Sequence, residues 1–333
     1  MKIVLAQSAG FCYGVRRAVE LAEETARKGD PCVMLGYIIH NKDMIDHLAG
    51  MGMRCVERVE DVPAGYNVIV RSHGESRAVH EQLERQGATI LNATCPNVTH
   101  IHKIVSEAEA QGRVPVIVGT PDHPEVMAIA GWCEHPVVVS GEEELSKWLE
   151  NDPKNRDLPL TFVSQTTSTR KIWDSAVKKA KKECTNTEFF DTICGATSKR
   201  QEEAIRLARE SDAMVVIGDR KSSNTKRLAE LCREVCSNVQ LIERAEDLDL
   251  SALSQAHQVG ITAGASTPAW IIKEVHKQMS EEILEMDKSF EEMLEESFKT
   301  LNTGDKVTGT VVAINPNEIQ VELGIKYPGF MGM

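Results

Sequence analysis

The most constraining feature of this chain is a repeated pairing of a short, continuously apolar segment with a polar loop. Six segments show the pairing, and each loop carries His, Ser, Thr or Asn: 33–36 before His40-Asn41, 68–70 before Ser72-His73-Gly74, 116–119 before His123-Pro124-Glu125, 162–163 before 164–167, 214–218 before Ser222-Ser223-Asn224, and 260–264 before Ser266. Strands of this kind are buried on both faces. Their alternation with helical stretches predicts parallel sheets in an α/β fold.

The loops that follow these strands are candidates for a binding site. In open α/β sheets, ligands bind outside the carboxyl ends of the strands. Here the ends carry neutral donors and few Lys or Arg side chains, a composition that suits a small anion such as phosphate near helix N-termini. Capping and turn formation explain any single loop equally well. The repetition over six loops favours a site.

Length, composition and charge exclude several classes of protein. With 333 residues, 41% hydrophobic and 26% charged, the chain is expected to form two or three globular domains. No apolar run is long enough to span a membrane, and the N-terminus resembles a strand rather than a secretory signal, so a cytoplasmic location is expected. The net charge of −12 argues against a general nucleic-acid surface. Half of that charge lies in the acidic segment 281–300.

The nine cysteines divide into two groups. An odd number without any CxxC predicts reduced thiols rather than a disulfide framework. Three cysteines, Cys12, Cys95 and Cys194, each follow a predicted strand and precede a predicted helix, whereas the others suit core packing. A thiolate is favoured at a helix N-terminus. Three such thiolates could hold a metal or an iron–sulfur cluster, although wide spacing alone does not specify one.

Eight short motifs, taken together and in order, resemble the LytB (IspH) family of 4-hydroxy-3-methylbut-2-enyl diphosphate reductases. They are Ala9-Gly10-Phe11-Cys12 with Gly14-Val15, Arg71-Ser72-His73-Gly74, Ala93-Thr94-Cys95-Pro96, His123-Pro124-Glu125, Ser164-Gln165-Thr166-Thr167, Thr192-Ile193-Cys194, Ser222-Ser223-Asn224, and Thr262-Ala263-Gly264-Ala265-Ser266. The resemblance runs from residue 1 to about 280. It implies a trefoil of three α/β units with mainly parallel sheets around a central cleft. The expected boundaries are 1–95, 96–193 and 194–280, with 281–333 as an appended segment.

The resemblance also implies a cofactor and a reaction. A 4Fe–4S cluster would be held by Cys12, Cys95 and Cys194, leaving one iron free of protein ligands to act as a Lewis acid on the substrate hydroxyl. The reaction is a two-electron reductive dehydroxylation that yields isopentenyl and dimethylallyl diphosphate, the last step of the non-mevalonate isoprenoid pathway. A protein such as ferredoxin or flavodoxin would supply the electrons.

Residue roles follow from the same resemblance. Glu125 would supply a proton, with Thr166 bracing the hydroxyl network and His123 beside them. The expected substrate-binding residues are His40, His73, His123, Thr166, Ser222, Ser223, Asn224 and Ser266. Neutral donors suffice because hydrogen bonds strengthen where water is excluded. One departure is Asp122, where the family usually has Gly, and this carboxylate is expected to point outward.

The appended segment has two predicted parts. Residues 281–300 are expected to form an acidic linker helix. Segments 304–314 and 318–324, joined by a turn at 315–317, and then 329–330 are expected to form two or three strands. They resemble the opening strands of the OB-type RNA-binding module of ribosomal small-subunit protein one. About thirty residues make the module incomplete, so the tail is expected to be poorly ordered and to bind RNA only if a longer chain completes it.

Two other functions compete with the reductase. One is another three-unit iron–sulfur enzyme, such as a condensing dehydratase similar to quinolinate synthase, which also needs an open iron. The other is an RNA-associated binding protein whose enzyme-like part is inactive. Isoprenoid diphosphate binding with net two-electron turnover distinguishes the reductase from both.

Overall fold

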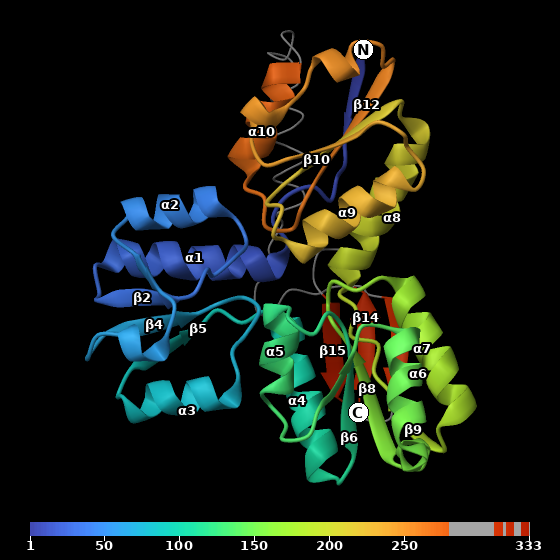
Figure 1. Ribbon diagram of the computed structural model, residues 1–333. Helices are drawn as coiled ribbons and strands as arrows, with labels where there is room; N and C mark the ends of the chain where they lie inside the picture. The colour runs from blue at the N-terminus through green and yellow to red at the C-terminus, as the bar shows by residue number, and fades with distance from the viewer. Residues whose placement is uncertain (280–309, 316–317, 323–327, 333) are drawn as a thin grey trace. The chain divides into compact units, whose positions relative to one another are not determined.

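The structure is a computed structural model that describes residues 1–279, 310–315, 318–322 and 328–332 (Figure 1). Two compact units account for the chain. The first unit comprises Met1–Tyr13, His40–Lys42 and Gly195–Met333, and the second comprises Gly14–Ile39 and Asp43–Cys194. The predicted acidic linker at 281–300 lies outside the described residues.

The second unit contains two four-stranded sheets. Its strands are β2 (Cys32–Leu35), β3 (Arg54–Val56), β4 (Asn67–Val70), β5 (Thr89–Asn92), β6 (Val114–Val118), β7 (Val137–Val139), β8 (Pro159–Ser164) and β9 (Asn186–Phe189). The strand orders are β3-β2-β4-β5 and β7-β6-β8-β9, and every neighbouring pair is parallel. The central strands β2 and β8 are almost entirely buried, which explains their continuous apolar sequences.

Helices connect these strands and cover the sheets (Figure 1). They are α1 (Tyr13–Lys28), α2 (Lys42–Gly50), α3 (Arg77–Arg85), α4 (Pro96–Ala110), α5 (Pro124–Ala130), α6 (Glu142–Asn151) and α7 (Arg170–Glu183), with 3₁₀ turns at Val59–Asp61 and Pro153–Arg156. Local chemistry sets where they begin. Proline occupies the first position of α4 and α5, and the hydroxyls of Ser76 and Thr169 cap α3 and α7.

The first unit contains a third parallel sheet. Its strands are β1 (Lys2–Leu5), β10 (Ala213–Ile217), β11 (Val239–Ile242) and β12 (Gln258–Ala263), in the order β1-β12-β10-β11. Its helices are α8 (Gly195–Glu210), α9 (Ser223–Arg233) and α10 (Ala269–Met279), with 3₁₀ turns at Ala245–Asp247 and Ser251–Leu253. Every residue of β10 is buried. The predicted α/β fold with parallel sheets is therefore confirmed.

One strand departs from the predicted boundaries. Segment 1–95 was expected to form one unit, yet β1 pairs in parallel with β12, and Lys2 lies opposite Gln258. Residues 1–13 consequently group with residues 195–279 rather than with the sheet of β2 to β5. The physical reason is that β1 covers the open edge of β12, whose other edge pairs with β10.

The described part of the tail forms a small antiparallel sheet. Strands β13 (Thr310–Asn315), β14 (Glu318–Glu322) and β15 (Pro328–Gly332) pair in that order. The strands predicted on either side of the 315–317 turn are present, and β15 contains the third predicted segment, 329–330. Among the helices that the structure describes, none combines the length and apolar composition needed to cross a bilayer.

Candidate active site

A buried carboxylate lies at the centre of the second unit's polar loops. Glu125, in the first turn of α5, is 2% exposed. Its Oε1 accepts a hydrogen bond from the Thr166 backbone N–H, and its Oε2 accepts one from the Thr166 hydroxyl, both at 2.6 Å. Burial raises the pKa of Glu125, and the two bonds from Thr166 oppose that rise. The structure thus places two of the predicted site residues, Glu125 and Thr166, in direct contact.

Two histidines accompany this carboxylate. His123 caps α5, where its Nδ1 accepts a hydrogen bond from the Glu125 N–H at 3.1 Å. An accepting Nδ1 leaves the neutral ring's proton on Nε2, which can then donate to a ligand. The ring of His73, from the loop after β4, meets the His123 ring edge-on with centroids 5.8 Å apart. The second unit thus brings His73, His123, Glu125 and Thr166 together.

Cys95 lies between the end of β5 and the start of α4. It occupies the N-cap position, Pro96 follows as the first helical residue, and the Cys95 N–H donates to the carbonyl of Ser72 at 2.9 Å. A Cβ atom at Gly14 would lie 2.5 Å from the Cys95 Sγ, so a side chain at position 14 would displace the thiol. The glycine in the motif Cys12-Tyr13-Gly14 therefore leaves room for the Cys95 sulfur.

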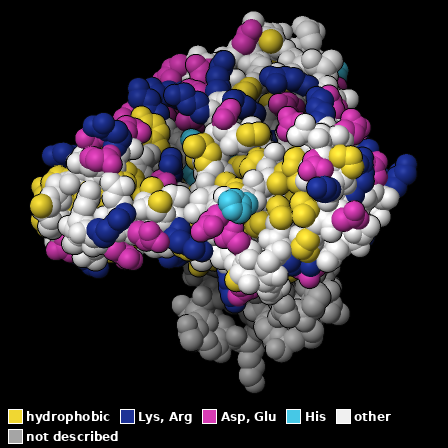
Figure 2. Space-filling model, turned by 60° about the horizontal axis from the view of Figure 1, so that its bottom comes forward, with side chains coloured by type: hydrophobic (Ala, Val, Ile, Leu, Met, Phe, Trp, Pro, Cys, Tyr) yellow, Lys and Arg dark blue, Asp and Glu magenta, His cyan; other side chains and the backbone are white. Residues whose placement is uncertain are grey.

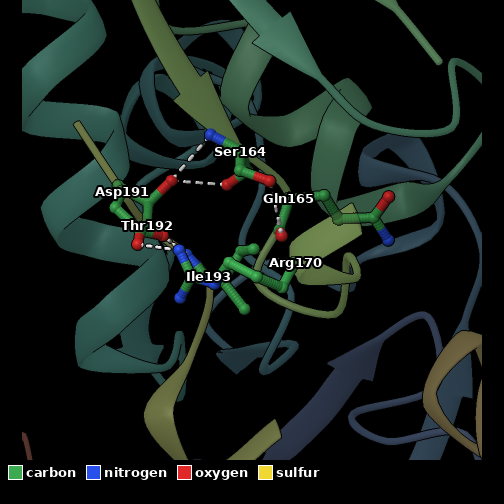
Figure 3. Close-up of polar contacts among 6 residues, drawn as sticks. All are labelled: Ser164, Gln165, Arg170, Asp191, Thr192 and Ile193. Carbon is green, nitrogen blue, oxygen red and sulfur yellow. Dashed lines mark hydrogen bonds and ion pairs between the residues drawn. The ribbon is translucent and has the colours of Figure 1, made fainter. Parts of the chain in front are cut away.

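The segment before Cys194 is fixed by polar contacts to the last residue of β8 and the first residue of α7 (Figure 3). The Thr192 hydroxyl accepts from the Ser164 N–H at 2.7 Å and donates to the Ser164 carbonyl at 2.6 Å. Asp191 accepts from the Ile193 N–H at 3.3 Å and forms an ion pair with Arg170. The Cys194 N–H donates to the Thr166 carbonyl at 3.0 Å, which ties this cysteine to the loop that holds Glu125.

The remaining cysteines have the chemistry of packing residues. Burial raises the pKa of Cys32 to about 11 and those of Cys133 and Cys232 to about 12, and it also raises the pKa values of Cys55 and Cys184. A raised pKa keeps a thiol protonated and therefore a poor metal ligand. The assignment of these residues to core packing agrees with this chemistry.

The first unit presents a second set of predicted residues. The Cys12 N–H donates to the Ala265 carbonyl at 3.1 Å, and the Ser266 hydroxyl donates to the His40 carbonyl at 2.8 Å. These bonds place Cys12, His40 and Ser266 around the loop that follows β12. The brief segment His40–Lys42 belongs to this unit although the residues on both sides of it belong to the other.

Asn224 is buried at the start of α9. The Ser222 hydroxyl caps the helix by accepting from the Thr225 N–H, and Asn224 occupies the second helical position. Asn224 is 4% exposed, and neither its Oδ1 nor its Nδ2 bonds any residue that the structure describes. A buried amide left unpaired costs about 1–3 kcal/mol, so this side chain has the chemistry of a group kept for a ligand.

Arg200, on α8, shapes the loop before Cys12. Its guanidinium is 1% exposed and donates to the carbonyls of Ser8 and Gly10 at 2.5–2.9 Å. Glu203, on the next turn of the helix, accepts from the backbone N–H groups of Gln7 and Ser8 at 2.8 Å. Sequence reasoning missed both residues because a charged helix position is usually solvated, and no local signal marks its burial.

A buried histidine supports the loop that carries His73. His102, on α4, stacks on Trp132 with centroids 5.0 Å apart, and a Cβ at Gly74 would lie 2.7 Å from its ring. Gly74 has a φ of +83°, which favours glycine in any case. Burial lowers the pKa of His102 to about 3, and the neighbouring His80 adds to this effect. His102 is therefore neutral at physiological pH.

The comparison with family models decides the relationship. A model described as "LytB protein" matches residues 3–280. The chain belongs to the LytB family. A relative from Geobacter sulfurreducens, named 4-hydroxy-3-methylbut-2-enyl diphosphate reductase, is 42% identical over 84% of this chain and 98% of its own length.

Two solved structures of the LytB type also resemble the chain. One, titled as (E)-4-hydroxy-3-methyl-but-2-enyl diphosphate reductase, the terminal enzyme of the non-mevalonate pathway, has a TM-score of 0.63 at 36% identity, covering 84% of this chain and 100% of its own. The other, the E-1-hydroxy-2-methyl-but-2-enyl-4-diphosphate reductase from Plasmodium falciparum, has a TM-score of 0.77 at 26% identity, covering 90% and 99%. The LytB match ends at residue 280 and gives no support to an OB-type RNA-binding module beyond it.

The predicted LytB residues are distributed over both units. Cys95 and Cys194 belong to the second unit and Cys12 to the first. Within the described parts of the chain, no three His, Cys, Asp or Glu side chains form a group able to hold a metal ion, so the ligand set stays a prediction.

Asp122 is exposed, as expected for a carboxylate that points outward. On the face shown in Figure 2, basic and acidic side chains are interspersed, without the continuous basic surface of a nucleic-acid-binding protein.

Proposed function

We propose that this LytB chain carries out the reaction for which its relatives are named, the reduction of 4-hydroxy-3-methylbut-2-enyl diphosphate. The allylic C–O bond breaks, two electrons and two protons enter, and water leaves, giving isopentenyl and dimethylallyl diphosphate. The family match over residues 3–280 and the identity to the Geobacter sulfurreducens reductase support this assignment. The observation that carries the mechanism is the buried Glu125, held by two hydrogen bonds from Thr166.

Cys12, Cys95 and Cys194 are the proposed ligands of a 4Fe–4S cluster. When bound, such a cluster supplies the electrons and one iron without a protein ligand, which polarises the substrate hydroxyl as a Lewis acid. The donor set suits the group, because these thiols lie at strand-to-helix junctions. The space that Gly14 leaves for the Cys95 sulfur supports the same assignment.

Glu125 is the proposed proton donor to the departing oxygen. Because burial raises its pKa, the carboxyl retains its proton to higher pH than an exposed glutamate. The Thr166 N–H and hydroxyl hold the carboxyl in one orientation. The Thr166 hydroxyl, bonded to the Glu125 carboxyl, would order the substrate oxygen as well as the proton donor.

The diphosphate is the proposed ligand of the neutral polar groups. They are His40, His73, His123, Thr166, Ser222, Ser223, Asn224 and Ser266. The helix α9 offers its first N–H groups at Ser223 and Asn224, and its macrodipole favours an anion there. A bound phosphate oxygen would accept from the Asn224 amide, which has no partner among the described residues.

The remaining parts of the proposal concern partners and location. A one-electron donor protein such as ferredoxin or flavodoxin is the proposed source of electrons, and the cytoplasm is the proposed location. RNA binding would require a complete C-terminal module in a longer chain. Apart from the placement of residues 1–13, the three-unit division at 95 and 193 remains a prediction, as does the trefoil arrangement of the units.

An anaerobic turnover assay tests the function. Purified protein is supplied with dithionite-reduced viologen and 4-hydroxy-3-methylbut-2-enyl diphosphate, and the two isoprenoid diphosphates are measured alongside iron content. Product formation by the wild type supports the reductase, and condensation without net reduction would instead support the quinolinate-synthase-like alternative. Full turnover by Glu125→Gln with normal iron content would contradict the role of Glu125.

A further inference from the structure

We propose that Asn97 raises the reduction potential of the cluster by donating a hydrogen bond to the sulfur of Cys194. The inference rests on the proposed function, because it assumes that Cys194 is a cluster ligand. It assigns a role to a residue that does not itself touch iron or substrate, so Asn97 is a positioning and tuning residue.

The geometry is a direct contact within the second unit. The Nδ2 of Asn97 lies 3.2 Å from the Sγ of Cys194, although the two residues are 97 positions apart in the sequence. A thiolate sulfur is an acceptor without a proton, so the amide must present its N–H groups rather than its oxygen. The contact therefore has the polarity that stabilises negative charge on this sulfur.

Both ends of the contact are fixed by their surroundings. Asn97 is the second residue of α4, between Pro96, which fixes the first turn, and Val98, which is 2% exposed in the core. Cys194 is held through its backbone N–H by the Thr166 carbonyl, and the preceding Thr192 is bonded twice to Ser164. The fold thus fixes the two backbone positions from which the amide and the sulfur meet.

Asn97 also links two of the proposed ligands. Cys95 is the N-cap of the same helix, two residues before Asn97. Helix α4 therefore carries one proposed ligand at its cap and, on its first turn, a donor to another. Any movement of this helix turn would alter the position of the Cys95 thiol and the hydrogen bond to Cys194 together.

The expected effect follows from the charge of the two redox states. Reduction adds an electron to the cluster, and part of the added charge resides on the thiolate sulfurs. A hydrogen bond to sulfur is consequently stronger in the reduced state, and such bonds are among the groups that set the potential of an iron–sulfur protein. Removing the donor should make the cluster harder to reduce.

The test is a redox titration of the anaerobically purified holoprotein, followed by electron paramagnetic resonance. At one fixed ambient potential, Asn97→Leu should lower the ratio of reduced to oxidised cluster by about three- to tenfold. The change is smaller than the full strength of the hydrogen bond, because only the difference in its strength between the two redox states shifts the potential. A tenfold change corresponds to about 59 mV for a one-electron couple. Asn97→Asp, which has the same size, lacks the donor and adds a negative charge, should lower the ratio further.

Thr99→Val is the matched control on the same helix turn. The Thr99 hydroxyl bonds the carbonyl of Cys95 at 3.4 Å and not a sulfur, so this variant should keep the wild-type ratio. A merely structural role for Asn97 would alter iron content or folding without shifting the ratio in the proteins that hold iron. Should Asn97→Leu fail to take up iron, Asn97→Asp provides the comparison.

The outcomes separate the inference from the function. A wild-type ratio in the iron-loaded Asn97 variants overturns the inference and leaves the reductase assignment standing. A wild-type protein that purifies anaerobically without an iron–sulfur signal and forms no product overturns both. A lowered ratio in both Asn97 variants, with Thr99→Val unchanged, supports the inference.

Discussion

Two buried polar side chains, Glu125 in the second unit and Asn224 in the first, differ in whether the fold satisfies their hydrogen bonds. In the second unit, both carboxyl oxygens of Glu125 accept hydrogen bonds from Thr166. The Cys194 sulfur accepts one from Asn97, and the Cys194 N–H donates to the Thr166 carbonyl. In the first unit, Asn224 is equally buried, yet both of its polar atoms lack partners among the described residues. The fold alone orients Glu125 for its proposed chemical step, whereas a ligand would have to supply the hydrogen bonds of Asn224.

This difference has an energetic meaning. The hydrogen bonds to Glu125 orient its carboxyl before any substrate binds, so the loss of this group should lower turnover. An unpaired buried amide destabilises the ligand-free protein. A ligand that bonds the amide removes this penalty, so the loss of the amide should weaken ligand binding. Substitution of Glu125 should therefore change mainly turnover, whereas substitution of Asn224 should change mainly KM.

The largest expected effect comes from removing a proposed cluster ligand in the second unit. Cys194→Ser should abolish product formation and lower the iron content, because a serine hydroxyl is a poor substitute for a thiolate at iron. Iron analysis and the anaerobic viologen assay measure both. The matched control is Cys184→Ser in the same unit, whose thiol has a raised pKa through burial and should retain iron and activity. Equal iron loss in the two variants would contradict the assignment.

The next effect should separate proton delivery from binding. Glu125→Gln is expected to reduce turnover by about 10²–10⁴-fold, the usual contribution of a positioned general acid. Because the amide keeps the size and much of the hydrogen bonding to Thr166, KM and iron content should change little. Steady-state kinetics at matched iron loading provide the measurement. A higher KM with unchanged turnover would instead show that Glu125 acts in substrate binding, as is proposed for Asn224.

A smaller effect should appear in the first unit with the opposite division. Asn224→Leu is expected to raise KM by about ten- to a hundredfold while raising the unfolding free energy of the empty protein by about 1–2 kcal/mol, because an unpaired buried amide is removed. Thermal unfolding and kinetics measure the two effects. Asn238→Leu serves as the control, since its amide already bonds the Ala252 carbonyl at 2.7 Å. That variant should lose stability and leave KM unchanged.

The smallest effect concerns pH and the histidine beneath the His73 loop. Burial lowers the pKa of His102 from 6.5 to about 3, so the folded protein binds fewer protons than the unfolded chain between these values. Its contribution to stability is present above pH 6.5 and is lost as the pH falls toward 3, at most about 1.4 kcal/mol per pH unit. His102→Phe preserves stacking on Trp132 and should flatten the pH dependence of the urea midpoint. Identical pH profiles would contradict this role.

Much of the second unit could be predicted from sequence because its signals are local. Continuous apolar strands such as 116–118 identify parallel strands, and the following His123-Pro124-Glu125 is recognisable by itself. The pairing of β1 with β12 could not be predicted, since its register depends on residues more than two hundred positions apart. Arg200 and Asn97 were missed for a related reason. Each is an ordinary polar residue on a helix, and only a distant partner shows its role.

The pairing of the first strand with β12 has a consequence for how the protein is made. Because Lys2 pairs with Gln258, the opening segment that carries Cys12 stays without its strand partner on the ribosome until β12 has been translated. The sheets of the second unit, built from residues 32–189, are complete well before then. Domains fold as units during synthesis. Cys12 is therefore the last of the three proposed sulfur ligands to reach its final conformation, and insertion of the proposed cluster should await synthesis of β12.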